Sequence, residues 1–177
     1  MFGVNLMKIE NLKEYIELSM NGVDKVSSEL DSLVDSVVSK SCKELDNYII
    51  YVKELLDDES RPITNIELDD IVMTIPTLVY FASNVQEIIG IREDIAKMNE
   101  NNALSEALSQ ANGTVQEKQA YAKSKIQTET LTTIVYQRAT KQIKAKTETA
   151  LEILQSCKKV LSRRMSEMEL SHNAPNK

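Results

Sequence analysis

The chain has few of the residues that interrupt helices or build catalytic sites. Its 177 residues include no Trp, one His, two Cys, three Pro and four Gly, and only 5% are aromatic. So little Gly and Pro leaves few turns, which favours a helical protein. No apolar run approaches the roughly 20 residues that a membrane-spanning helix needs, so we expect no membrane span.

The scarcity of Cys and His limits metal, redox and His-based chemistry. Cys42 and Cys157 have no CxxC spacing, and His172 stands alone in a polar stretch. A zinc site needs about four ligands, so we expect no metal and no cofactor. We interpret the two thiols as small hydrophobic packing residues that form no disulfide in a reducing compartment.

Other signatures of enzymes are also missing. The four glycines stand far apart and form no phosphate-binding loop. Two carboxylate clusters, at residues 57–59 and 69–70, lie at predicted helix ends, where acids are common, and metal binding is the alternative interpretation. Residues 1–10 contain one Lys and no apolar core long enough for a signal peptide. We therefore expect a non-enzymatic protein that stays in the cytoplasm.

Apolar periodicity predicts helices in the first 60 residues. Residues 4–20 suggest a short amphipathic helix that ends at Asn21-Gly22, since both residues tolerate the left-handed conformation of a C-cap. A second helix runs to about Asp58, with apolar residues close to a 3–4 repeat. Together they predict an acidic N-terminal helical hairpin over residues 1–60, followed by a polar break at Asp57–Pro62.

A third helix is predicted to open with a capping box formed by Thr64 and Glu67. Pro76 lies within its apolar face and should kink or interrupt it, so two helices over residues 65–75 and 76–98 are the alternative. The polar residues 98–113 predict a long, mobile connection. Residues 171–177 predict a disordered tail.

The stretch Thr114–Leu170 contains no Gly and no Pro and predicts one long α-helix. Thr114 and Glu117 form a second capping box at its start. An apolar stripe at helical spacing then needs a partner helix, either in this chain or in another copy. The packing or oligomer seam comprises Ile143, Ala150, Leu154, Cys157 and Leu161. The predicted fold class is all-α, with four to five helices in a bundle or coiled-coil-like hairpins, and residues 61–170 form its helical core.

Charge is distributed unevenly along the chain, although the net charge is only −6. Residues 1–100 carry nine Lys/Arg and twenty Asp/Glu, whereas residues 101–177 carry twelve and seven. Such a split indicates an end that faces a polyanion or self-association between unlike ends. The alternative is that acidic and basic helices pack together within one monomer.

The basic residues of the long helix are the candidates for nucleic-acid contacts. The predicted set is Lys118, Lys123, Lys125, Arg138, Lys141, Lys158, Lys159, Arg163 and Arg164. Tyr121 or Tyr136 is available for base stacking. The alternative is a solvated helix face whose cations favour the negative end of the helix dipole. Lys146 and Arg164 flank the apolar stripe, where we expect them to meet acids on a neighbouring helix.

Two segments, TVQEKQAYAKSK and VYQRATKQIKAKTETALEILQSCKKVLSRRMSEMEL, carry a family resemblance. They resemble the UvsY-type recombination mediators of T-even-like phages, over roughly residues 65–170. The matching pieces are Lys123 and Lys125 in AYAKSK, Tyr136, Ala150, and Ser162-Arg163.

The resemblance implies a protein that assembles as helical rings and binds single-stranded DNA. It also implies that the protein helps a recombinase displace the single-strand binding protein, with DNA contacts at Lys123 and Lys125 only. A phage structural or assembly protein that acts only through protein–protein contacts is the alternative. Both interpretations predict a homo-oligomer, in the host cytoplasm if a phage encodes it, with no membrane partner.

Overall fold

The computed structural model describes the backbone of residues 3–172 and the side chains of residues 20–170. This part of the chain contains four α-helices and no strand: α1 (Gly3–Asp57), α2 (Asn65–Gln110), α3 (Val115–Lys125) and α4 (Gln127–His172). The all-α fold class is confirmed. None of the helices within residues 3–172 is long and apolar enough to cross a membrane.

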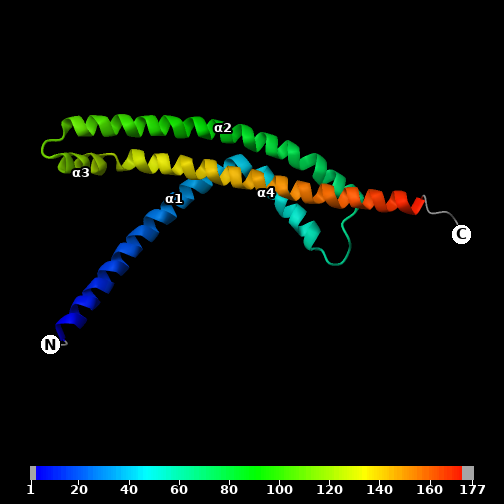
Figure 1. Ribbon diagram of the computed structural model, residues 1–177, viewed down its shortest axis with the longest axis horizontal. Helices are drawn as coiled ribbons and strands as arrows, with labels where there is room; N and C mark the ends of the chain where they lie inside the picture. Colours follow the sequence, from blue (N-terminus) through cyan, green and yellow to red (C-terminus); the bar gives the residue numbers. More distant parts are fainter. Residues whose placement is uncertain (1–2, 173–177) are drawn as a thin grey trace.

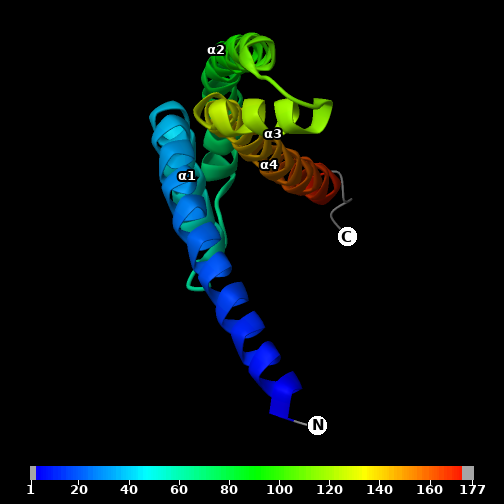
Figure 2. The same ribbon diagram turned by 90° about the vertical axis from the view of Figure 1, so that its left-hand side faces the viewer.

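The helices α2 and α4 lie side by side and antiparallel, and their contact is the main one in the bundle (Figure 1). The short α3 lies beside the C-terminal end of α2 and leads into α4. The C-terminal half of α1 packs against the pair, whereas its N-terminal half projects away from it (Figures 1 and 2). The molecule is therefore an elongated helical hairpin with a third helix that extends beyond it.

One apolar core joins α1, α2 and α4. Its fully buried members include Cys42 and Val52 of α1 and Ile75 of α2. The predicted seam of α4 lies in this core: Ile143, Ala150, Leu154 and Cys157 are buried, and Leu161 packs at its edge. The seam is thus occupied by helices of the same chain, so it supplies no free surface for an oligomer.

Polar contacts fix α1 against the other two helices. Lys146 Nζ lies 2.7 Å from Asp46 Oδ1, which confirms that Lys146 meets an acid on a neighbouring helix. The Tyr48 hydroxyl donates to Asp70 Oδ2 at 2.6 Å. Burial and this hydrogen bond raise the pKa of Tyr48 to about 12, so the phenol stays neutral and remains a donor at ordinary pH.

The N-terminal helix differs from the prediction. α1 runs without a break from Gly3 to Asp57, so the C-cap at Asn21-Gly22 and the hairpin over residues 1–60 are wrong. A single Gly inside a helix costs only about 1 kcal/mol relative to Ala. The apolar repeat continues on both sides of Gly22, and a continuous helix preserves it. The apolar side chains predicted for residues 4–16 lie outside the described part of the chain.

α2 continues through Pro76, where a kink or break was predicted, and through most of residues 98–113, where a mobile connection was predicted. It runs uninterrupted through Pro76, because Ile75 and Ala82 on either side pack into the same core and outweigh the one backbone hydrogen bond that Pro removes. The mobile connection predicted over residues 98–113 is wrong up to Gln110. There α2 is held by Ala107, which is buried against α3.

The long helix predicted over Thr114–Leu170 is divided into α3 and α4 at Ile126. This residue has φ −97° and ψ 19° and ends α3. The Ile126 amide donates to the Ala122 carbonyl at 3.2 Å, and the Ile126 carbonyl accepts from the Thr130 amide at 3.0 Å. The bend places the apolar Ile126 side chain in a second cluster with Ala107 and Ala122. α4 extends to His172, so the predicted tail begins later than expected, and residues 173–177 lie outside the described part.

Residues 58–64 connect α1 to α2, in agreement with the predicted polar break. The capping box is confirmed: the Glu67 amide donates to Thr64 Oγ1 at 3.2 Å, and the Thr64 amide donates to Glu67 Oε2 at 2.7 Å. Arg61 also donates to Glu67, at 2.6 Å and 3.0 Å. The Arg61 guanidinium, followed by the Thr64 amide, lowers the pKa of Glu67 from 4.5 to about 2.

Glu67→Gln is expected to remove an acid-sensitive part of the stability. Because folding lowers the pKa of Glu67, its carboxylate stabilises the fold fully above pH 4.5, and this contribution is lost as the pH falls from 4.5 towards 2. The free energy of unfolding should differ most between wild type and variant at neutral pH, and the difference should shrink in acid. Urea unfolding followed by circular dichroism measures it, and a difference that is independent of pH would contradict the prediction.

Candidate nucleic-acid interface

A tight turn and a capping box orient α3. Gly113 has φ +113°, a conformation that side chains rarely adopt, and a Cβ there would lie 2.6 Å from Glu117 Oε2. The Thr114 amide donates to Glu117 Oε2 at 2.8 Å, which confirms the second predicted capping box. The fully buried Ala122 then anchors α3 against Ala107 of α2. Lys118, one turn earlier, is half-buried, and the other residues of α3 are exposed.

Two lysines and a tyrosine share one side of α3, where Tyr121 and Lys125 are exposed and Lys118 is half-buried next to Ala122. Lys118, Tyr121 and Lys125 are spaced by three and four residues, which places them on one face of the helix. Lys125 Nζ lies 5.6 Å from the centroid of the Tyr121 ring, within cation–π range. Tyr121 is 41% exposed. Within the described part of the chain, no carboxylate lies at ion-pair distance from either lysine. We call these three residues the α3 basic face.

Three other predicted residues line a cleft between α1 and α4. Arg138 and Lys141 lie across from Asp31 and Asp35, around a cavity of about 680 Å³. Lys123 borders a second, more apolar cavity of about 630 Å³, which also reaches α1. We call this region the α1–α4 cleft. Because carboxylates form part of its wall, the cleft is a poor surface for a phosphate backbone.

The last four predicted residues lie near the C-terminal end of α4. Lys158 and Lys159 are exposed, whereas Arg163 Nε pairs with Glu167 at 2.8 Å within the helix. Arg164 donates from Nη1 to the Ile63 carbonyl at 2.7 Å and to Asn65 Oδ1 at 3.1 Å. It was expected to meet an acid. Instead it ties α4 to the start of α2, so its cation is engaged within the chain.

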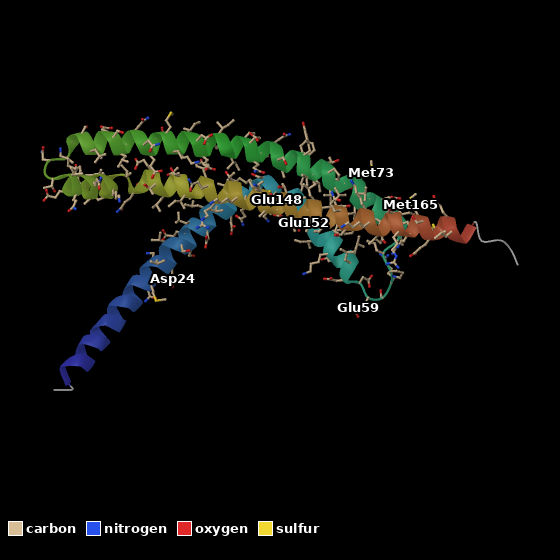
Figure 3. All side chains as sticks on the ribbon, in the orientation of Figure 1. Asp24, Glu59, Met73, Glu148, Glu152 and Met165 are labelled. Atoms are coloured by element: carbon tan, nitrogen blue, oxygen red, sulfur yellow. The ribbon has the colours of Figure 1, made fainter. Side chains whose placement is uncertain are left out.

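The nine predicted residues therefore do not form one surface. Lys125 and Lys158 are 33 positions apart, which is roughly 50 Å along a helix. Glu148 and Glu152 lie in the middle of α4 between the two ends (Figure 3), and Glu148 is 3.8 Å from Lys144. Tyr136 packs against the core and is not free to stack on a base. The α3 basic face is the part of the set in which cations and an accessible ring come together.

The structure also exposes an apolar surface that the sequence pattern did not reveal. α2 buries one face against α4, but Ile66, Met73, Tyr80, Ile88, Ile91, Ile95 and Met98 are between 48% and 82% exposed. Their spacing in steps of three, four, seven and eight places them opposite the buried face. Met73 is seen on the outer side of α2 in Figure 3. We call these residues the outer stripe of α2.

Comparison with known proteins assigns no family: no family model matches the chain, and no curated protein or solved structure is significantly similar to it. Among the described side chains of residues 20–170, no group of three or more His, Cys, Asp or Glu residues is arranged to hold a metal ion. The geometry of the chain's own residues is therefore the basis for a functional proposal.

Proposed function

We propose that this protein is a non-enzymatic mediator of recombination or replication that binds single-stranded DNA and helps to load a recombinase. The α3 basic face is the observation that carries the proposal. Proteins that bind single strands combine cations that follow the phosphates with aromatic rings on which bases stack. The exposed Lys125 and the half-buried Lys118 supply the cations, and Tyr121 supplies an exposed ring between them. The role in recombinase loading rests on the resemblance of the AYAKSK segment.

One α3 helix offers few contacts and would hold DNA weakly. A homo-oligomer that presents several copies of α3 gains avidity without a new type of contact. The outer stripe of α2 is a surface through which copies can associate, because exposed apolar side chains that follow one another along a helix face mark interaction sites. DNA binding and assembly thus use different helices, and single substitutions can separate them.

Lys118→Ala combined with Lys125→Ala is expected to weaken binding to single-stranded DNA by about tenfold or more. The plot of log affinity against log salt should become shallower by about 1.4, since each phosphate contact to a single strand contributes roughly 0.7. Fluorescence anisotropy of a labelled oligonucleotide measures both quantities. The matched control is Lys158→Ala with Lys159→Ala, which removes the same charge from exposed positions on α4. Equal losses in the two variants would contradict a specific role for α3.

The ring provides a second control within the same experiment. Removing a stacking side chain costs about 1–3 kcal/mol per base, so Tyr121→Ala should weaken DNA binding by about tenfold or more. Tyr121→Phe keeps the ring and should bind nearly as well as wild type. If both variants bind as tightly as wild type, Tyr121 does not stack on DNA.

The second candidate function is that of a structural or assembly protein that acts only through protein–protein contacts. The outer stripe of α2 favours it, because a helix that is apolar on two opposite faces needs a cover on both. Under this alternative no DNA binding is detected even at low salt. Substitutions in the outer stripe then change the association of the protein with its partners, and substitutions in α3 do not.

A further inference from the structure

The C-terminal part of the outer stripe of α2 is a continuous apolar seam. Ile88, Ile91, Ile95 and Met98 follow one another in steps of three, four and three residues, and each is between 48% and 59% exposed. Alternating steps of three and four residues are the repeat through which helices pair in a coiled coil. In Figures 1 and 2 no other helix lies on the side of α2 that faces away from α4. We call these four residues the α2 seam.

The α2 seam has an acidic edge and a basic edge. Glu87 and Asp94 lie along one edge and Arg92 lies along the other, since a five-residue step turns a helix by about 140°. All three side chains are exposed. Asp94 has Lys97 of the same helix at 4.0 Å.

Glu87 and Arg92 have no ionic partner among residues 20–170, because neither lies at ion-pair distance from an opposite charge there. The positions three and four residues away from each carry no opposite charge, so α2 cannot pair either of them with a neighbour on its own surface. Each is therefore available to an opposite charge on another molecule.

We propose that two copies of this chain pair through the α2 seam, with their α2 helices parallel and in register. The acidic edge of each copy then faces the basic edge of the other. Glu87 of one copy lies beside Arg92 of the second copy, five positions further along, which is the relation that pairs charges across a parallel coiled coil. The two-fold axis forms this ion pair twice. The inference deepens the proposed function, since it specifies a contact of the homo-oligomer on which that function relies.

The charges favour a second copy in this orientation over the antiparallel one. An antiparallel pair around the same seam brings identical edges together, so that Arg92 faces Arg92 and Asp94 faces Asp94. Like charges at such positions destabilise a helix pair. A parallel copy instead supplies the seam, the acid and the base that this surface needs, all from the same face of the same helix.

The orientation also decides where the α3 basic faces lie. α3 lies beside the C-terminal end of α2 (Figure 1), so a parallel pair carries both basic faces at the same end. In an antiparallel pair they would lie at opposite ends of α2, whose 46 residues span roughly 70 Å. One DNA strand can then contact both faces of a parallel pair and gain avidity. This consequence rests on the proposed function, whereas the pairing does not.

Disulfide formation between identical positions tests the pairing in the full-length chain. Ile91→Cys and Met98→Cys should each give a covalent dimer after mild oxidation, because parallel helices in register place identical residues within the roughly 7 Å that a disulfide needs. Asn101→Cys is the matched control: it is exposed but off the seam, and it should stay unlinked. The native Cys42 and Cys157 are buried and should not react.

An antiparallel pair links identical residues only close to its two-fold axis, and positions 91 and 98 are roughly 10 Å apart along the helix. A dimer from only one of the two positions, or from neither, would therefore overturn the proposal. An equal yield from Asn101→Cys would also overturn it, because the links would then not depend on the seam.

A charge exchange identifies the contact more narrowly. Glu87→Arg and Arg92→Glu should each weaken association by about tenfold, because each places like charges together twice. The double variant should associate like wild type, since it restores both ion pairs with their signs reversed. Both side chains are exposed, so the variants should stay folded. Sedimentation velocity measures the dissociation constants, and a double variant as weak as the single ones would contradict the pairing.

DNA binding by the linked dimer tests the shared end. The oxidised Met98→Cys dimer should bind a labelled single strand severalfold more tightly than Ile91→Asp, which is expected to be monomeric. Equal affinities would show that the two α3 basic faces do not act on one strand. If neither protein binds DNA while the covalent dimers form as expected, the proposed function fails and the parallel pairing stands.

Discussion

Ile143→Ala is expected to lower the free energy of unfolding by about 2–5 kcal/mol. Ile143 is fully buried in α4, at the centre of the core that α4 shares with α1 and α2. Truncation removes apolar contacts and leaves a cavity, because helices on both sides restrain any collapse. For a protein of this size, the melting temperature should fall by roughly 5–15 °C. Urea and thermal unfolding followed by circular dichroism measure the two quantities.

Ile50→Ala is the matched control for this substitution. It removes the same atoms from a helical Ile that is 56% exposed on α1, so we expect a change of about 0.5 kcal/mol or less. Equal losses for the two variants would mean that α4 does not form the core described here. A large loss confined to Ile143→Ala would support a single core that depends on α4.

Ile91→Asp is expected to dissociate the homo-oligomer that we propose to form through the outer stripe of α2. Ile91 is 59% exposed in the single chain, so the substitution should leave the helical fold intact. In an assembly it would bury an unpaired carboxylate, which costs several kcal/mol. The dissociation constant should then rise by about a hundredfold or more. Sedimentation velocity over a range of concentrations measures the change.

Asn101→Asp serves as the control for added charge on α2. It places the same carboxylate at an exposed position off the outer stripe, and we expect the sedimentation of wild type. If Ile91→Asp also sediments like wild type, copies do not associate through this surface. The outer stripe would then be available to a different protein, as the purely structural function requires.

Local signals in the sequence predicted much of the secondary structure correctly. Both capping boxes form, because a Thr followed three residues later by Glu satisfies backbone donors without help from the rest of the fold. The apolar seam of α4 is buried as its spacing indicated, and Lys146 meets Asp46 because a cation flanking a seam faces the next helix. These features depend on residues close together in sequence or on helix periodicity alone.

Features decided by tertiary packing were not predictable in the same way. Gly22 and Pro76 favour helix ends locally, but both lie inside long helices whose apolar repeats continue past them. Ile126 is apolar and gave no sign of a break, yet α3 ends there and its side chain joins a cluster with Ala107, 19 positions earlier. In each case a contact with a distant segment outweighed the local preference.

The candidate site was only partly predictable. Charge counting selected nine basic residues as candidates, but it could not show which of these cations the fold already uses. Arg164 is taken up by the Ile63 carbonyl, and Arg138 lies across a cleft from Asp31. These partners are about 100 positions away in the chain, so only the folded structure brings them together.

The most direct test of the central claim is fluorescence anisotropy of a labelled DNA single strand, titrated with the wild-type protein at low and at moderate salt. If α3 binds phosphates and stacks on bases, the affinity should be measurable at low salt. The affinity should then fall steeply as salt rises. In a plot of log affinity against log salt concentration, each phosphate contact should contribute roughly −0.7 to the slope. Absence of binding at low salt, or binding that does not respond to salt, would contradict the account and leave protein–protein assembly as the function to pursue.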